Sequence, residues 1–262
     1  MDLAPLLHAL EPLVVLVLLA MARAGGLLFA LPQFTTGSVP RMVKGIALVA
    51  MSIALVFGAG PPVLPSAHPL AIGVAMIVEV VIGAALGFVV HLLFAAAKIA
   101  GEILGVEMGL SFSAVADPTH PGTSTATAAI LGHLAVQLFF ALRLDHVIVG
   151  ALAHSTREVP LGAAVLTQSA VLGLTKLGSD MLLTALRWSL PVLAVLLAVK
   201  LAIAVLARFV PRLQIFSLAF GITLVIGLWA LGQALPGLAA AMSGRLADVG
   251  RDLAALVAAL AP

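Results

Sequence analysis

The chain has 262 residues, of which 63% are hydrophobic and 9% are charged. Soluble domains are typically about half apolar and about a quarter charged, so this composition excludes a disordered region and almost any water-soluble enzyme. The formal net charge is +2 and the basic residues are scattered, which excludes a nucleic-acid-binding domain. We predict a protein of a membrane or a membrane-associated assembly, and we treat residues 1–262 as a single membrane domain.

The N-terminal segment does not have the pattern of a secretory signal. A signal peptide places basic residues ahead of its apolar run, whereas Asp2 and Glu11 come first here and the first basic residue is Arg23. The segment is therefore expected to remain in the mature protein. Basic residues favour the cytoplasmic side of a membrane, so Arg23, Arg41 and Lys44 place the N-terminus outside. Cysteine is absent, which excludes disulfides, thiolate metal sites and cysteine nucleophiles.

Hydropathy predicts a succession of helices. A bilayer core about 30 Å thick requires about 20 apolar helical residues, and candidate helices lie at 12–31, 41–57, 69–112, 125–155, 163–187, 189–210, 213–235 and 239–260. Prolines make residues 58–69 a rigid connector. Because the stretch 69–112 would be about 65 Å long as a helix, we expect a bend or break near 83–87 or 98–101, or a helix that projects beyond the membrane.

The last predicted helix, residues 239–260, is amphipathic. Apolar residues recur there at helical spacing with charged residues between them, namely Leu246, Val249, Leu253, Leu256, Val257 and Leu260 against Arg245, Asp248, Arg251 and Asp252. Such a helix lies along a surface, which the pattern leaves open as either membrane or protein.

Ionisable residues occur well inside several predicted helices. A charge at the bilayer centre costs at least about 2.5–3.5 kcal/mol, unless the side chain lies near a helix end and reaches the interface. Both alternatives stay open for individual residues. The candidates for burial against other subunits are Arg23, Glu79, Lys98, Glu102, Lys200 and Arg208.

The sequence contains none of the common catalytic motifs. A phosphate-binding loop, a zinc-binding His-Glu-x-x-His helix and a Gly-x-Ser-x-Gly turn are all missing. The histidines do not pair at i,i+4 on one helix, which a helical metal site would require. Asp145 and His146 are adjacent, so we expect their side chains to diverge on a helix. We therefore predict no enzyme, no metal and no cofactor.

Glycine recurs at every fourth position in two places. Gly101, Gly105 and Gly109 form two overlapping Gly-x-x-x-Gly steps, and Gly83 and Gly87 form one step upstream. Without side chains at these positions another backbone can approach closely, which is how helices pack where lipid offers no hydrophobic drive. We predict helix-packing surfaces at both places.

A break follows the second glycine stripe. The segment holds Ser111, Phe112, Ser113, Asp117, Pro118, Pro121 and Gly122. Two prolines, a glycine and small hydroxyl residues do not continue a helix. Irregular backbone at membrane depth persists only where it is buried in protein or lines a water-filled cavity. The segment is therefore either a surface loop joining two helices or a loop inserted into a pore.

At this point the sequence resembles a known family. Gly-Glu-Ile-Leu-Gly (101–105), Met-Gly-Leu-Ser-Phe (108–112) and Asp-Pro (117–118) together look like the signature of the FliR/SctT family of type III export-gate membrane proteins. Further matches are Arg23 before Pro32, the segment 38–41 with Lys44, and Leu190-Pro191 leading to Arg208, Pro211, Gln214 and Phe216. The resemblance spans about residues 23–223.

The chain departs from the family pattern at some positions. Lys200 stands where the family usually has a polar uncharged residue, and Ala204 where glycine is usual. Gly221 replaces a common proline, and Asp145 stands before His146 where glycine is common. These departures concern the packing of the C-terminal half.

The resemblance implies an all-α membrane protein of helical hairpins, packed within a larger helical assembly in the bacterial inner membrane. The implied partners are FliP-like and FliQ-like gate subunits and FlhB-like and FlhA-like export components. Unfolded flagellar substrates would pass through the central pore at the base of the flagellar basal body. The loop at about 111–124 would help to plug that pore.

Two alternatives to a flagellar gate subunit remain. The same subunit could serve a virulence or symbiosis injectisome. A different class is a stand-alone transporter that uses Glu79, Lys98 and Asp117 as a proton path. Against the transporter, the sequence has no clear pair of inverted repeats with matching broken helices.

Overall fold

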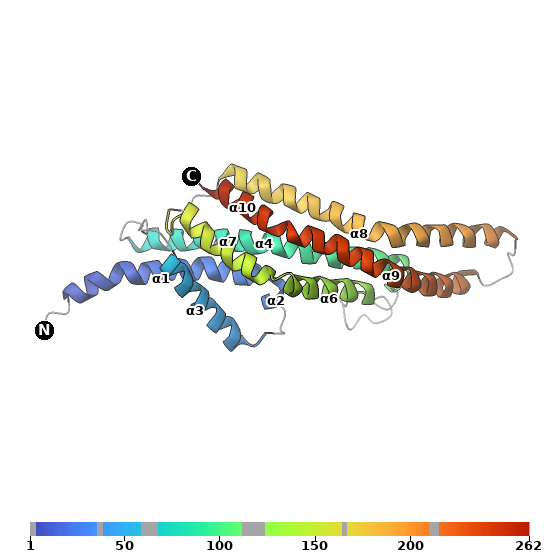
Figure 1. The fold of residues 1–262 in the computed structure, drawn as a ribbon, viewed down its shortest axis with the longest axis horizontal. Coiled ribbons are helices and arrows are strands. Elements are labelled where there is room, and N and C mark those ends of the chain that lie inside the picture. The colour runs from blue at the N-terminus through green and yellow to red at the C-terminus, as the bar shows by residue number, and fades with distance from the viewer. Residues whose placement is uncertain are drawn as a thin grey trace. The chain divides into compact units, whose positions relative to one another are not determined.

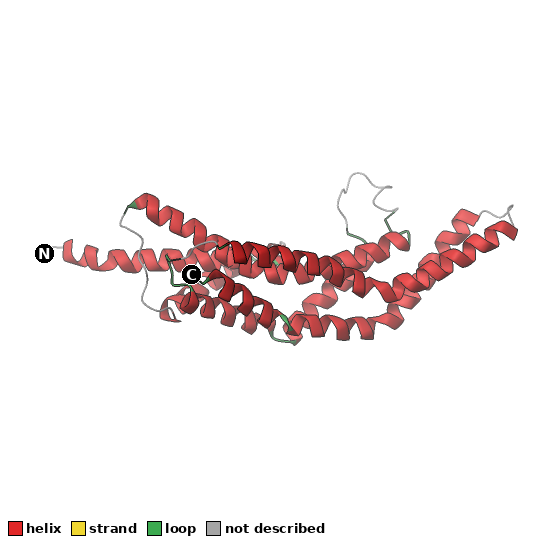
Figure 2. Cartoon of the chain, turned by 90° about the horizontal axis from the view of Figure 1, so that it is seen from above, coloured by secondary structure: helices red, strands yellow, loops and turns green. Residues whose placement is uncertain are grey.

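The computed structural model describes residues 4–35, 39–58, 68–111, 124–163, 167–209 and 215–261. Over these residues the chain forms helices and connecting turns and no strand (Figure 2). In chain order the helices are α1 (Ala4–Ala30), α2 (Pro32–Thr35), α3 (Arg41–Gly58), α4 (Pro69–Glu107), α6 (Ala126–Ala141), α7 (Leu144–Glu158), α8 (Gln168–Phe209), α9 (Ile215–Ala247) and α10 (Val249–Leu260), as labelled in Figure 1. The predicted all-α class is confirmed.

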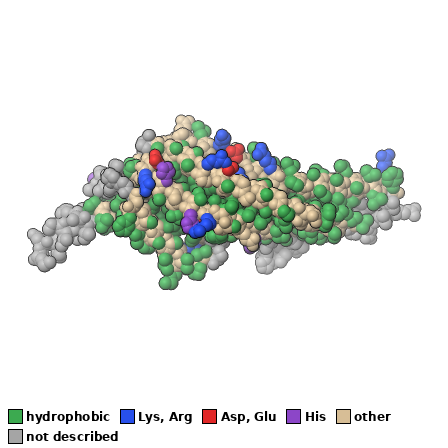
Figure 3. Space-filling model, viewed as in Figure 1, with side chains coloured by type: hydrophobic (Ala, Val, Ile, Leu, Met, Phe, Trp, Pro, Cys, Tyr) green, Lys and Arg blue, Asp and Glu red, His purple; other side chains and the backbone are tan. Residues whose placement is uncertain are grey.

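Several helices are apolar and long enough to cross a membrane. The described residues contain five such helices, or six if α6 and α7 together make one broken span. Hydrophobic side chains cover much of the face seen in Figure 3, and charged side chains are few. Length and apolar surface therefore fit a multi-pass membrane protein.

The helix boundaries differ from the predicted ones at four places. Helix α4 runs unbroken over 39 residues from Pro69 to Glu107, so the predicted break near 83–87 or 98–101 is absent, and the alternative of a helix longer than the bilayer core is the one that its length fits. Helix α8 continues through Pro191 and α9 through Pro236. A proline removes only one backbone hydrogen bond of its helix, and a packed apolar helix tolerates that loss. The predicted helix 125–155 divides into α6 and α7 at Arg143, which has φ 54°.

By its internal packing the chain divides into two compact units. Unit 1 contains residues 1–92, 143–178 and 248–262, and unit 2 contains residues 93–142 and 179–247. Helices α4 and α8 contribute residues to both units. The prediction of one membrane domain, with a C-terminal amphipathic helix, remains a prediction.

In unit 1, glycines bring α1 and α4 into backbone contact. A Cβ atom at Gly83 would overlap the Arg23 carbonyl, and one at Gly87 would lie 2.6 Å from the Leu27 carbonyl oxygen. Gly26 on α1 faces the Val80 carbonyl in the same way. Of the two roles that the sequence suggests for Gly83 and Gly87, a break in α4 or a helix-packing surface, the structure shows close packing on α1.

A buried ion pair lies beside this contact in unit 1. The Arg23 Nε donates to Glu79 Oε2 at 2.5 Å, and both side chains are fully buried. The Arg23 Nη1 donates to the carbonyls of Ser155 and Val159, each at 3.0 Å. The other Glu79 oxygen accepts the Gly162 N–H at 2.9 Å. Arg23 thus satisfies carbonyls at the C-terminal end of α7, where a cation is favourable.

These contacts correct one expectation about Arg23 and Glu79. The sequence suggests burial against other subunits, whereas each residue has its partner in the same chain and no exposed side-chain surface. A buried charge requires a compensating partner and hydrogen bonds. Unit 1 provides them for Arg23 Nε and Nη1, whereas Arg23 Nη2 is buried without a hydrogen-bond partner in the described part of the chain. The pair joins α1, α4 and the end of α7.

Helix α10 closes unit 1 at the C-terminal end of the chain. It runs beside α7 (Figure 1) and buries an apolar stripe of Val249, Leu253, Leu256, Val257 and Leu260. The hydroxyls of Thr167 and Ser169 donate to the Ala259 carbonyl at 2.5 and 3.1 Å. In this structure the apolar face of the amphipathic helix packs on protein.

Candidate functional site

Helix α4 ends in a capping motif just before the predicted loop. Gly109 has φ 82°, a left-handed conformation that glycine adopts without a Cβ penalty. The Leu110 N–H donates to the Gly105 carbonyl at 2.8 Å, and the Gly109 N–H donates to the Val106 carbonyl at 3.0 Å. This is the Schellman pattern, so Gly109 terminates the helix and turns the chain out of it.

Helix α6 begins just after the loop with a threonine cap. The Thr125 hydroxyl accepts the Ala128 N–H at 3.3 Å, and Thr125 itself has the extended backbone typical of an N-cap. Residues on both sides of 112–123 are therefore fixed by local helix-capping chemistry.

The two loop ends are also fixed to each other within unit 2. The Glu102 carboxylate accepts the Thr125 N–H at 3.1 Å, and the Thr127 hydroxyl donates to the Gly101 carbonyl at 2.7 Å. A Cβ at Gly101 would overlap the Ala128 backbone, and one at Gly105 would lie 2.5 Å from the Thr125 hydroxyl. We call Gly101, Glu102, Gly105, Thr125 and Thr127 the loop anchor.

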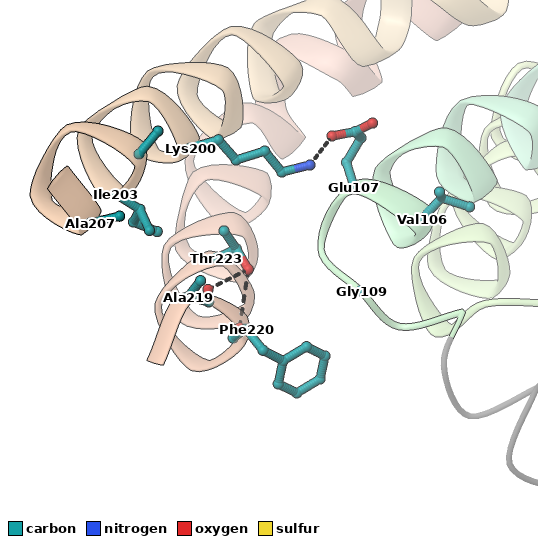
Figure 4. A pocket seen from close by; sticks show the side chains of 10 residues that line it. Val106, Glu107, Gly109, Lys200, Ile203, Ala207, Ala219, Phe220 and Thr223 are labelled. Atoms are coloured by element: carbon teal, nitrogen blue, oxygen red, sulfur yellow. Dashed lines mark hydrogen bonds and ion pairs between the residues drawn. The ribbon is translucent and has the colours of Figure 1, made fainter. Parts of the chain in front are cut away.

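Helices α8 and α9 contact the C-terminal end of α4 through side chains. The Met108 side chain packs directly on Gly227 of α9. A Cβ added at this glycine would lie only 2.7 Å from the Met108 side chain. The Lys200 ammonium forms an ion pair with Glu107 (Figure 4). Both groups are partly exposed, so the pair contributes little to stability by itself. It holds α8 against the residue at which α4 ends.

A largely apolar pocket lies beside this ion pair, all of it within unit 2. Its volume is about 370 Å³. It is lined by Val106, Glu107, Gly109, Lys200, Ile203, Ala204, Ala207, Ala219, Phe220 and Thr223 (Figure 4). Lys200 and Ala204, two of the departures from the family pattern, both line it. These two departures are four residues apart on α8, so they lie on the same helix face.

Exchanging the charges of Glu107 and Lys200 tests whether their ion pair stabilises unit 2. We expect Lys200→Glu to lower the thermal stability of unit 2, because two carboxylates then face each other, and Glu107→Lys with Lys200→Glu to restore it. A double-mutant cycle on thermal unfolding in detergent measures the coupling, expected at about 0.2–1 kcal/mol for a partly exposed pair. A coupling of zero would mean that the pair does not hold α8 to α4.

The remaining predicted site residues are placed as follows. Ser111 is half-buried next to the capping motif, whereas Phe112, Ser113, Asp117, Pro118, Pro121 and Gly122 lie outside the described residues. Lys98 and Arg208 are exposed and Glu102 is half-buried in the loop anchor. Among the described residues there is no group of three or more His, Asp or Glu side chains that could hold a metal ion.

Two residues of the loop anchor, Thr125 and Thr127, belong to none of the sequence motifs described above. Thr125 and Thr127 hold the far end of the loop, and a threonine directly before an apolar helical run is a recognisable N-cap signal. Their pairing with Glu102 and Gly101 has no sequence signal, because more than twenty residues separate the partners.

The chain is similar in sequence to known bacterial export proteins. Residues 14–249 match the family model described as bacterial export proteins, family 1. The flagellar biosynthetic protein FliR of Escherichia coli (strain K12) is 32% identical over 217 residues, which is 82% of this chain and 82% of that protein. The FliR protein of Caulobacter vibrioides is 29% identical over 243 residues, 88% of this chain and 92% of its own. The FliR protein of Aquifex aeolicus is 24% identical over 241 residues, 91% of this chain and 92% of its own.

The fold and composition define a helical, multi-pass class of membrane protein. Within that class, the chain belongs to family 1 of the bacterial export proteins. The similarity to the FliR proteins over most of the chain confirms the resemblance inferred from its motifs.

Proposed function

We propose that the chain is a non-catalytic structural and gating subunit of the flagellar type III protein-export channel. Its relatives carry the name flagellar biosynthetic protein, and its apolar helices fit a multi-pass protein of the bacterial inner membrane. In this proposal it assembles with FliP-like and FliQ-like subunits and with FlhB-like and FlhA-like components. Unfolded flagellar substrates pass through the shared pore.

The observation that carries the gating part of the proposal is the loop anchor. Glu102 and Gly101 on α4 bond to Thr125 and Thr127 on α6, so the segment between them leaves from and returns to one fixed place. A plug that must block a pore reproducibly needs such a rigid base. The anchor supports insertion of residues 111–124 into the central pore, rather than their serving as a plain connector.

The plug predicts a defined effect of shortening the loop. We expect deletion of residues 117–122 to raise small-ion leakage across the closed channel severalfold while the chain still assembles, because the capping motifs and the anchor lie outside the deletion. Leakage is measured as ion-dependent growth inhibition or as flux in vesicles containing the purified complex. A variant with the same six residues replaced by Gly and Ser keeps the loop length and tests whether the side chains matter.

Assembly must be measured in parallel with leakage. Normal co-purification of FliP-like and FliQ-like subunits with the deletion variant, together with unchanged leakage, would refute the plug. Recovery of a stable lone chain without such partners would instead refute membership in the gate. The similar proteins of Escherichia coli, Caulobacter vibrioides and Aquifex aeolicus are all named as flagellar proteins, which favours the flagellar system over an injectisome.

A further inference from the structure

Helix α7 is the most highly charged helix among those described. Its fifteen residues include Asp145, His146, His154, Arg157 and Glu158, and Arg143 directly precedes it. The other helices of unit 1 carry fewer ionisable groups for their length, α10 having Arg251 and Asp252 among its twelve residues. A polar helix face in so apolar a chain requires an explanation.

The two faces of α7 have different environments. Leu144, Ile148, Leu152, Ser155 and Thr156 are buried in unit 1. The opposite face, here called the α7 outer face, consists of Arg143, His146, Val149, Gly150, Ala153, His154 and Arg157. These residues follow the i, i+3, i+4 spacing of one helix face. Figure 3 shows histidine and basic side chains gathered over α7.

The acidic groups near this face are already engaged. The Asp145 carboxylate lies 2.9 Å from His146 Nδ1, although the sequence suggests that these side chains diverge. The Arg143 Nη2 is 3.0 Å from His146 Nε2, so Nε2 accepts and the proton resides on Nδ1. Glu158 lies 3.9 Å from His154. Arg157 has no carboxylate within ion-pair distance in the described part of the chain.

The middle of the α7 outer face is small and apolar. A Cβ at Gly150 would meet no atom within 4 Å, Val149 is 45% exposed and Ala153 is half-buried. Arg143 and Arg157 stand at its two ends, about 21 Å apart at 1.5 Å per residue. A small apolar centre with a polar rim is the anatomy of a protein interface, and an open glycine lets a second helix approach closely.

A lipid surface fits this face less well. Lipid tails exclude a row of ionisable groups. A helix that binds anionic headgroups inserts its own apolar face into the bilayer, whereas the apolar face of α7 is used inside unit 1.

We propose that the α7 outer face docks a helix of a neighbouring subunit of the export assembly. That helix presents small residues over Gly150 and acidic side chains opposite Arg143 and Arg157. The inference rests on the proposed function, because it requires that the chain works inside an assembly.

A photo-crosslinking residue at Val149 tests the docking in the complex purified through the tagged, full-length chain. The expected product is a covalent adduct with a co-purifying gate subunit, whose attached peptide is helical and bears acidic residues about four turns apart. We expect Arg143→Glu with Arg157→Glu to reduce the adduct at least about tenfold, because the reversed charges repel the acidic partner. Arg251→Glu on α10 is the control that leaves the adduct unchanged.

Gly150→Leu separates docking from folding. Its side chain enters open space in the isolated chain, so we expect unchanged thermal stability of the chain and a loss of the adduct as large as in the double variant. Gly173→Leu on α8, which is equally open, is its matched control. Adducts with lipid only, no adduct, or an adduct insensitive to both changes would overturn the docking while the gate subunits still co-purify. Failure to recover any gate subunit would overturn the proposed function as well.

Discussion

Replacing Arg23 with methionine should destabilise the chain more than any surface substitution. The change leaves the fully buried Glu79 carboxylate without its cation and removes the donor from the Ser155 and Val159 carbonyls. Breaking a buried pair from one side typically costs about 3–5 kcal/mol. Thermal unfolding of the detergent-solubilised chain, followed by the circular dichroism of its helices, measures the loss.

The double variant Arg23→Met with Glu79→Leu identifies the cause. It removes both charges at similar volume, a change that is often neutral in other proteins. Here we expect partial recovery, because the Gly162 N–H also loses its acceptor. Lys200→Met, which breaks the partly exposed pair in unit 2, is the control and should cost less than about 1 kcal/mol. Equal losses in the single and double variants would show that packing volume, rather than unpaired charge, sets the stability.

The helices are predictable from the sequence because apolar runs are a local signal. The end of α4 is predicted less well: the sequence pattern extends that helix to residue 112 and places Gly109 in a packing stripe, whereas α4 ends at Glu107 and Gly109 caps it with a left-handed backbone. The signal for this cap is local too, since its two hydrogen bonds involve only residues 105–110.

The partner of each glycine and each charge is not predictable in this way. Gly83 in isolation is equally consistent with a break and with a packing contact, and only the position of the Arg23 carbonyl on α1 decides between them. In the same way Arg23 and Glu79 are 56 residues apart, and Lys200 and Glu107 are 93 residues apart. A single sequence shows which charged residues are present but not which of them pair with one another. From the sequence alone, a charged residue with a partner in the same chain therefore cannot be told from one that pairs with another subunit.

At two prolines the sequence pattern predicts a helix boundary that the structure does not have. Pro191 and Pro236 lie inside α8 and α9, although the sequence pattern places a helix boundary near each of them. A proline removes one backbone hydrogen bond, which long apolar helices tolerate when their remaining turns are packed or lie in lipid. The predicted subdivision of the C-terminal half therefore yields longer helices than the sequence pattern suggests.

Alanine at Gly101 should lower the stability of the chain, whereas alanine at Gly232 should leave it equal or slightly higher. In the interior of an exposed helix, alanine is favoured over glycine by about 0.5–1 kcal/mol, and a Cβ at Gly232 meets no atom within 4 Å. At Gly101 the same Cβ overlaps the Ala128 backbone, so α6 must move away from α4 at an overpacking cost of about 1–3 kcal/mol. That movement also stretches the Thr127 bond to the Gly101 carbonyl and releases one end of the loop anchor.

The opposite signs of the two changes in melting temperature, measured on the same detergent-solubilised chain, test the contact directly. If both variants were stabilised, α6 would not pack on the glycine stripe, and the rigid base on which the plug depends would be lost with it.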